Sequence, residues 1–90
     1  MTQAIVNPEE LRQFAQMLKQ FDSALADQMA TLSSRLESLS ASWRDQENQR
    51  FREEFEQNIK LMSRFIEVNE EHIPFLLRKA ERIEEYLQQR

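Results

Sequence analysis

The stretch SASWRDQENQRFREEF, residues 40–55, holds the only tryptophan of the chain, Trp43, in otherwise polar surroundings. The serines just before Trp43 favour local hydrogen bonds between side chain and backbone, which compete with a continuing helix. Ser42 or Asp45 can then cap a new helix. The stretch therefore predicts that the chain reverses direction at residues 42–45, between two helices.

The overall composition favours helices almost to the exclusion of sheets. The 90 residues include no glycine and only two prolines, and 31% of them are charged, a profile typical of helical proteins. We predict one all-α domain spanning residues 1–90. A chain this short buries only a modest share of its surface when it folds alone, so oligomerisation is a common route to stability.

Charge and cysteine usage restrict the partners of the chain. The formal net charge is -4, which argues against nucleic acid because phosphate binding depends on lysine and arginine. No cysteine is present, so no disulfide or thiolate metal site is expected. The sequence shows neither a signal-peptide pattern nor the roughly 18 apolar residues of a membrane span. We predict no membrane insertion, and either a cytoplasmic location or secretion without a cleavable signal peptide.

The first helix is predicted over residues 8–41. Asn7 can cap it, Pro8 suits its first position, and Glu10 completes a capping-box spacing. Apolar residues then follow at steps of three or four, which predicts one stripe along the helix. The two consecutive steps of four after Phe21 form a stutter, which keeps the stripe nearly straight. The stripe comprises Leu11, Phe14, Leu18, Phe21, Leu25, Met29, Leu32, Leu36, Leu39 and Trp43.

The second helix is predicted over residues 46–88, with a stripe of its own. Its only polar member is Asn69, which is either a register device, as a buried asparagine is in some coiled coils, or a solvated position. The stripe comprises Phe51, Phe55, Ile59, Met62, Ile66, Asn69, Ile73, Leu76, Ala80, Ile83 and Leu87.

Pro74 interrupts this second helix, because proline removes one backbone hydrogen bond and crowds the preceding turn. The apolar residues after it stay in phase with those before it, which predicts a kink near residues 70–74; a break, with a third short helix starting at Pro74, is the alternative. The second helix is also the longer one, so the end beginning at Ala80 should extend past the first helix, with only Ile5 and Val6 to cover it.

A second apolar face lies beside the stripe of the second helix. Two helices cannot enclose both faces, so either this face stays partly exposed or another hairpin packs on it and completes a four-helix bundle. We favour the bundle, with a homodimer as the simplest source of the other hairpin and a related second chain as the alternative. The predicted interface comprises Leu61, Phe65, Val68, His72 and Phe75.

The layout around the turn resembles the WXG family, the small helical hairpins associated with type VII (ESX) secretion. The resemblance rests on Trp43 at the reversal, on Phe51 and Phe55 after it, and on Leu36 and Leu39 before it. It implies an antiparallel hairpin that dimerises into a four-helix bundle, is often encoded with a partner and is often exported. A secretion ATPase is then a further expected partner.

Two positions depart from the family pattern. Where the family has Trp-x-Gly, this chain has Trp43, Arg44 and Asp45, and the aspartate can cap the second helix instead. The family's export signal reads Tyr-x-x-x-Asp/Glu, whereas Tyr86 is followed four residues later by Arg90. We interpret Tyr86 and Arg90 as a degenerate export signal, so that export either does not occur or depends on a partner that supplies the signal.

Trp43 itself has two interpretations. Its ring can pack across the open end of the hairpin, while its indole N–H meets a partner or water. Alternatively, it is an exposed recognition residue for a component of the secretion system. A turn tryptophan is accessible to a larger partner, so both roles are compatible.

Catalytic and metal-binding patterns are weak. A Glu-x-x-His ligand pair with the single histidine, His72, would need a glutamate at position 69, where Asn69 stands. The many carboxylates fall on solvated helix faces, and a chain without glycine has no glycine-rich phosphate loop. We predict no enzyme, metal or cofactor, and an interaction protein that is a substrate or accessory factor of a type VII-like secretion system. The alternative is a cytoplasmic coiled-coil adaptor or chaperone that binds a helical partner.

Overall fold

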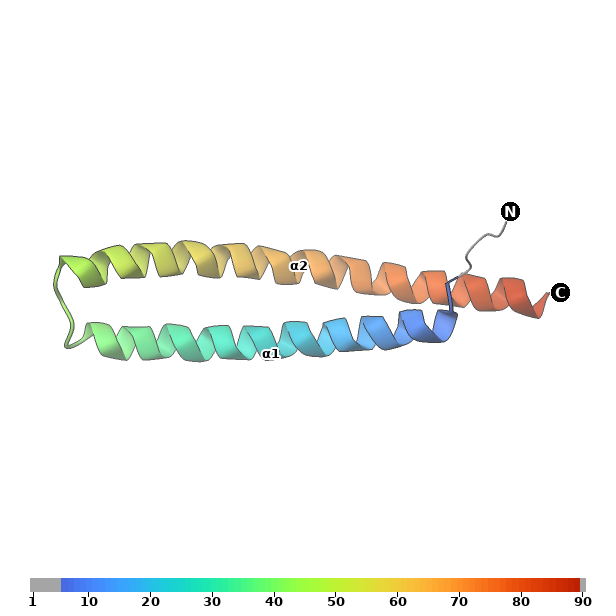
Figure 1. Cartoon of the computed structure of the whole chain (residues 1–90), viewed down its shortest axis with the longest axis horizontal. Coiled ribbons are helices and arrows are strands. Elements are labelled where there is room, and N and C mark those ends of the chain that lie inside the picture. The colour runs from blue at the N-terminus through green and yellow to red at the C-terminus, as the bar shows by residue number, and fades with distance from the viewer. Residues whose placement is uncertain (1–5, 90) are drawn as a thin grey trace.

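The protein is an antiparallel pair of long helices (Figure 1). The computed structural model describes residues 6–89, in which α1 spans Pro8–Ser40 and α2 spans Gln46–Gln88. The hairpin extends over 68 × 24 × 16 Å, so it is an elongated unit two helices wide. The predicted all-α helical hairpin is confirmed; its association into a bundle remains a proposal.

Local signals explain where α1 begins and ends. The Asn7 side chain accepts a hydrogen bond from the Glu9 N–H at 2.8 Å, which satisfies one of the unpaired donors of the first turn. At the other end, the Trp43 N–H donates to the Leu39 carbonyl at 2.9 Å. The helix ends at Ser40, one residue before the predicted Ala41, which has become the C-cap.

The start of α2 depends on one carboxylate. Asp45 Oδ1 accepts a hydrogen bond from the Asn48 N–H at 3.1 Å, the N-cap arrangement that the sequence suggested. From there α2 continues without interruption to Gln88, so no third helix begins at Pro74. The apolar residues that stay in phase past Pro74 keep this part of α2 against α1, which offsets the hydrogen bond that proline removes.

The seam, the row of side chains between the two helices, follows a seven-residue repeat. On α1, the buried residues Ala15, Asp22, Met29 and Leu36 are seven apart, with the half-buried Leu18 and Leu25 and the exposed Leu32 between them. Steps that alternate between three and four are the repeat of coiled-coil pairs. The facing residues of α2 are Asn48, Arg52, Phe55, Ile59, Met62, Ile66, Asn69, Ile73, Leu76, Ala80 and Ile83.

This seam corrects the predicted stripe of the first helix. Phe14 is 55% exposed and Phe21 is 52% exposed, whereas Ala15 and Asp22, which the prediction omitted, are buried. The predicted stripe therefore joined residues from two neighbouring faces of the helix: Phe21 lies outside the seam, and Asp22 lies in it. The repeat within the seam is regular, and a hydrogen bond between Asp22 and Asn69 lies inside it.

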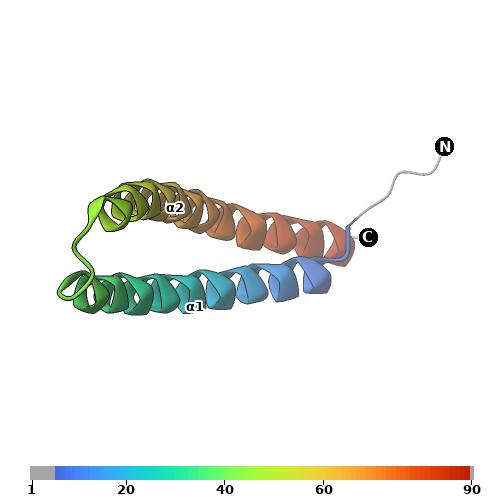
Figure 2. The ribbon, with the colours of Figure 1, turned by 60° about the vertical axis from the view of Figure 1, so that its left-hand side comes forward.

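The two helices approach more closely near the termini than near the turn, as Figures 1 and 2 both show. Small side chains explain the difference, because Ala15 and Ala80 are both fully buried at the close end and allow the backbones to approach. Larger residues such as Met29 and Phe55 separate the helices at the turn end.

The far end of α2 is covered better than predicted. Arg12 forms an ion pair with Glu84, so Ala80 lies within the paired part of the hairpin. Figure 1 shows α2 continuing past the start of α1, and the exposed residues Tyr86 and Leu87 lie in this overhang. Ile5, which was expected to help cover it, lies outside the described residues.

Candidate interaction face

A continuous apolar surface, which we call the apolar face, runs along one side of the seam. On α1, Phe14 and Phe21 each stand one position before a seam residue. On α2, Phe51 and Phe65 each stand one position before a seam residue as well. In an antiparallel helix pair these positions lie on the same side. The exposed apolar side chains of this face are Phe14, Met17, Phe21, Leu32, Leu39, Phe51, Leu61, Met62, Phe65 and Phe75.

One aromatic contact joins the two halves of the apolar face. The rings of Phe21 and Phe65 meet edge to face, with centroids 6.3 Å apart, a favoured geometry for aromatic pairs. Each ring is nonetheless about half exposed. Their outer surfaces are therefore available to another molecule.

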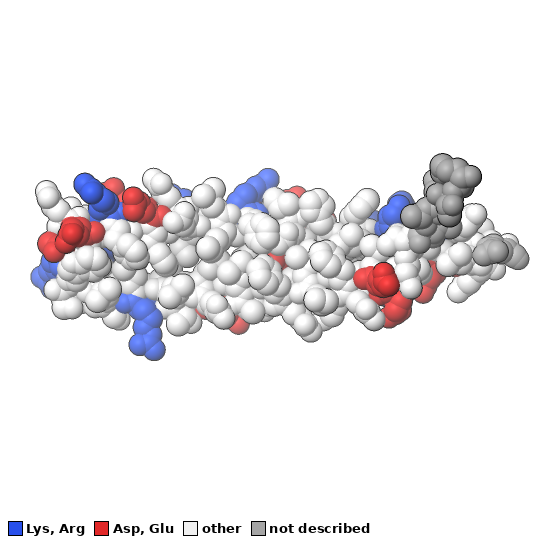
Figure 3. All heavy atoms as spheres, viewed as in Figure 1, with Lys and Arg blue, Asp and Glu red and all other residues white. Residues whose placement is uncertain are grey.

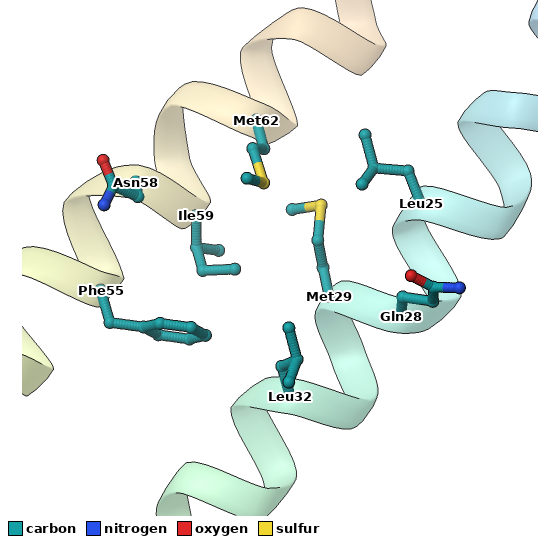
Figure 4. A pocket seen from close by; sticks show the side chains of 8 residues that line it. All are labelled: Leu25, Gln28, Met29, Leu32, Phe55, Asn58, Ile59 and Met62. Atoms are coloured by element: carbon teal, nitrogen blue, oxygen red, sulfur yellow. The ribbon is translucent and has the colours of Figure 1, made fainter.

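Two adjoining hollows deepen the apolar face between its centre and the turn. Figure 4 shows Met29 and Met62 pointing toward each other across the first one, which has a volume of about 200 Å³. The second also measures about 200 Å³ and shares Leu32 and Phe55 with the first. The first is lined by Leu25, Gln28, Met29, Leu32, Phe55, Asn58, Ile59 and Met62, and the second by Leu32, Arg35, Leu36, Leu39, Phe51 and Phe55.

On the opposite side of the seam, an ion pair joins the two helices. Arg12 on α1 donates to Glu84 on α2, with Nη1 2.8 Å from Oε2. This hydrogen bond lowers the pKa of the Glu84 carboxyl and raises that of the Arg12 guanidinium.

Figure 3 shows one side of the hairpin as a surface of atoms. On this side, charged groups lie mostly near the two ends, and few lie along the middle.

The structure brings the predicted turn residues together. The centroids of Trp43 and Phe51 are 6.3 Å apart, and those of Phe51 and Phe55 are 5.9 Å apart. Trp43 is half-buried, so this aromatic stack has both a packed and an accessible side. Asp45 stands outside the stack and acts as the cap of α2.

The turn needs no glycine. No residue in the range 6–89 has a positive φ angle, and Asp45 has an extended backbone with φ of -88°, which any residue except proline adopts readily. The buried Asn48 donates from Nδ2 to Ser40 Oγ at 3.1 Å. This contact ties the start of α2 to the end of α1, and sequence reasoning missed it.

The residues predicted for the dimer interface lie on or beside the apolar face. Leu61 is 68% exposed, Phe65 and Phe75 are half exposed, and His72 is exposed, whereas Val68 is half-buried. The contribution of α1, from Phe14, Met17 and Phe21, was missed because two of these were assigned to the core. Of the degenerate export signal, Tyr86 is exposed and Arg90 lies outside the described residues.

A hydrogen bond between Asp22 and Asn69 lies within the seam, and only Asn69 was considered from the sequence. Asn69 Nδ2 donates to Asp22 Oδ1 at 2.9 Å, and Asp22 is 2% exposed. The sequence carries a partial signal for this position, the leucine at every seventh position from Leu11 to Leu39. That repeat places the leucines along the seam and leaves positions 21 and 22 as the two candidates beside them.

Two further observations bear on the kind of site. Over residues 6–89, no group of three or more histidine, cysteine, aspartate or glutamate side chains is placed to hold a metal ion. Neither described helix has a segment apolar and long enough to cross a membrane.

The fold and the apolar face define a small helical hairpin that offers one surface for protein association. The chain belongs to the WXG100 family, described as proteins of 100 residues with WXG, whose sequence model matches residues 3–87. The resemblance noted at the turn is thereby confirmed, and it identifies a non-enzymatic helical family associated with secretion. No curated protein and no solved structure matches the chain.

Proposed function

We propose that this chain is an interaction module of a type VII-like secretion system, acting as a substrate or accessory factor after pairing through its apolar face. The observation that carries the proposal is that face, which is not covered by any other part of residues 6–89. Large exposed apolar patches on soluble proteins mark association sites. Family membership supports the link to secretion.

A second copy is the simplest occupant of the apolar face. A two-fold dimer buries the same surface on both partners, and a face of aromatic, leucine and methionine side chains is complementary to itself. Burying each such side chain contributes about 1.5–3 kcal/mol. Two hairpins joined in this way form a four-helix bundle, with Leu61, Phe65, Val68, His72 and Phe75 in the interface.

The aromatic stack of Trp43, Phe51 and Phe55 at the turn supports recognition by a larger partner, for which a secretion ATPase is the candidate. Trp43 and Phe51 lie at the extreme end of the hairpin, where α1 and α2 are joined. Tryptophan is enriched at the centres of protein interfaces, because it combines a large apolar surface with one donor. The half-buried Trp43 is therefore our proposed contact residue at this end.

A secretion assay tests the function. A tagged chain should accumulate outside a host that contains the secretion system, and deletion of the membrane ATPase should abolish this. Trp43→Ala should lower the exported amount, whereas Trp43→Phe, which keeps an aromatic ring, should retain more of it. Export that is unaffected by loss of the ATPase would refute the assignment.

The adaptor function remains a second candidate, favoured by Arg90 in place of the acidic residue of the export signal. In that case the chain stays in the cytoplasm of the same host under all conditions. Co-expression with a related hairpin that carries an intact signal separates the two candidates. Export only in its presence supports a carried substrate, and retention in its presence supports the adaptor.

A further inference from the structure

We infer that the hydrogen-bonded pair of Asp22 and Asn69 sets the rotation of the first half of α1 about its axis, and thereby keeps Phe14 and Phe21 on the outside of the hairpin. The inference deepens the proposed function, because those phenylalanines belong to the apolar face through which we propose association. It concerns the contacts within one chain, so it can be tested separately from association.

The two halves of α1 prefer different rotations. Neighbouring residues of an α-helix point about 100° apart, so a rotation of that size would bring Phe14 and Phe21 into the places of Ala15 and Asp22. In the first half of α1, that rotation would replace a methyl group and a carboxylate in the seam by two phenylalanine rings. The same rotation would exchange Leu18 for Met17 and Leu11 for Glu10. Two rings gained against one leucine lost still favour it on apolar burial alone.

The second half of α1 favours the observed rotation. Here the seam holds Met29 and Leu36, and the same rotation would replace them by Gln28 and Arg35. A change confined to the first half of the helix requires only a local change of winding. The steps of four from Phe21 to Leu25 to Met29 provide such a stutter.

The hydrogen bond from Asn69 is what favours Asp22 inside the seam. Its length is 2.9 Å, and Asp22 is 2% exposed. The other carboxylate oxygen, Oδ2, is buried without a hydrogen-bond donor among residues 6–89. Asp22 thus depends on a single partner, and without that partner a buried carboxylate would be driven toward water.

The predicted consequence of losing Asn69 is an exchange of faces in the first half of α1. Asp22 would move to the surface, and Phe14 and Phe21 would enter the seam. Phe21 would then no longer stand edge to face with Phe65 on the outside. The apolar face would lose the rings of Phe14 and Phe21, and association through this face should weaken.

Thiol reactivity reports this rotation directly, because the chain contains no cysteine of its own. Ala15→Cys places a thiol where the side chain is 1% exposed, and Ala80→Cys places one where it is 0% exposed. Both sites are shielded within the hairpin itself, whatever its state of association. The first reports the rotation of α1, and the second reports whether the hairpin is still folded.

In the otherwise unchanged chain, both thiols should be protected from a water-soluble maleimide. With Asn69→Leu, the thiol at position 15 should react at least tenfold faster while the thiol at position 80 stays protected. Asp22→Asn combined with Asn69→Asp exchanges acceptor and donor and should restore protection at position 15. Gln57→Leu, at an exposed position of the same helix, is the control and should change neither rate.

Two outcomes would overturn the inference. Continued protection at position 15 with Asn69→Leu would show that the pair does not set the rotation, even if association is lost. Fast reaction at both positions would show that the pair stabilises the whole hairpin and does not select one face. An exchange of faces without loss of association would instead contradict the proposed interface, while leaving the role of the pair intact.

Discussion

Single polar residues determine where the helices of this hairpin start and which faces they bury. Asp45 occupies the glycine position of the family motif and caps α2 through the Asn48 N–H. The sequence alone indicated this role, because N-caps act over three residues of the chain. The bond between Asp22 and Asn69 joins residues 47 apart, so no local pattern could reveal the partner of Asp22.

The cap at Asp45 gives a direct prediction. Asp45→Ala removes the acceptor of the Asn48 N–H and should lower the free energy of unfolding by about 1 kcal/mol. Asp45→Asn keeps an acceptor and should lower it much less. Urea unfolding followed by circular dichroism, at one fixed protein concentration, measures both variants. Equal losses in the two variants would show that the hydrogen bond is unimportant.

The ion pair of Arg12 and Glu84 predicts a pH dependence. The hydrogen bond from Arg12 lowers the pKa of Glu84 in the folded state. The stabilisation is therefore fully present above the ordinary glutamate pKa of about 4.3 and is lost as the pH falls through the lower folded value.

Thermal unfolding of the unchanged chain and of Glu84→Gln at several pH values measures this contribution. The unchanged chain should have the higher melting temperature at pH 7, and the difference should shrink as the pH falls below the ordinary glutamate pKa and Glu84 takes up a proton in the folded state as well. Glu85→Gln, at an exposed neighbouring position, should show no such change. A difference of the same size at every pH would rule out the ion pair as its source.

At the scale of the elements, helix type and position were predictable, whereas the rotation of α1 was not. Caps, proline and the spacing of apolar residues mark where α1 and α2 lie, because these signals are local. Choosing between Phe21 and Asp22 as the buried residue requires knowledge of what α2 places opposite them. Hydrophobicity alone selected the phenylalanine, and the hydrogen bond to Asn69 reverses that choice.

The continuity of α2 through Pro74 gives a prediction for that helix. Pro74 is exposed, so its replacement by alanine loses little packing and restores an N–H that can donate to the Glu70 carbonyl. Proline costs about 3 kcal/mol more than alanine in a helix interior. Pro74→Ala should therefore raise the free energy of unfolding, by about 1–3 kcal/mol.

The same urea experiment checks this expectation, with Glu71→Ala as the control at an exposed neighbouring position. The control should change stability by less than about 0.5 kcal/mol. A loss of stability in Pro74→Ala would contradict the account, because it would mean that the proline ring makes a contact that matters or that α2 requires its distortion.

At the scale of the whole molecule, the hairpin has more apolar surface than its own seam can bury. Among the apolar residues of the range 6–89, the seam buries only Ala15, Met29, Leu36 and Ala80. The larger rings of Phe14, Phe21, Phe65 and Phe75 stay half exposed. The sequence predicted this excess on α2, where the second stripe stands beside the first, but missed the share that α1 contributes.

The central claim is that a second copy covers this excess, and sedimentation velocity at micromolar concentration tests it most directly. The unchanged chain should sediment as a dimer, with twice the single-chain mass of 10.9 kDa. A control variant with Gln20→Asp and Ser63→Asp, both at exposed positions, should do the same. Phe21→Asp combined with Phe65→Asp should sediment as a single chain. A helical, stably folded monomer of the unchanged chain would contradict the claim.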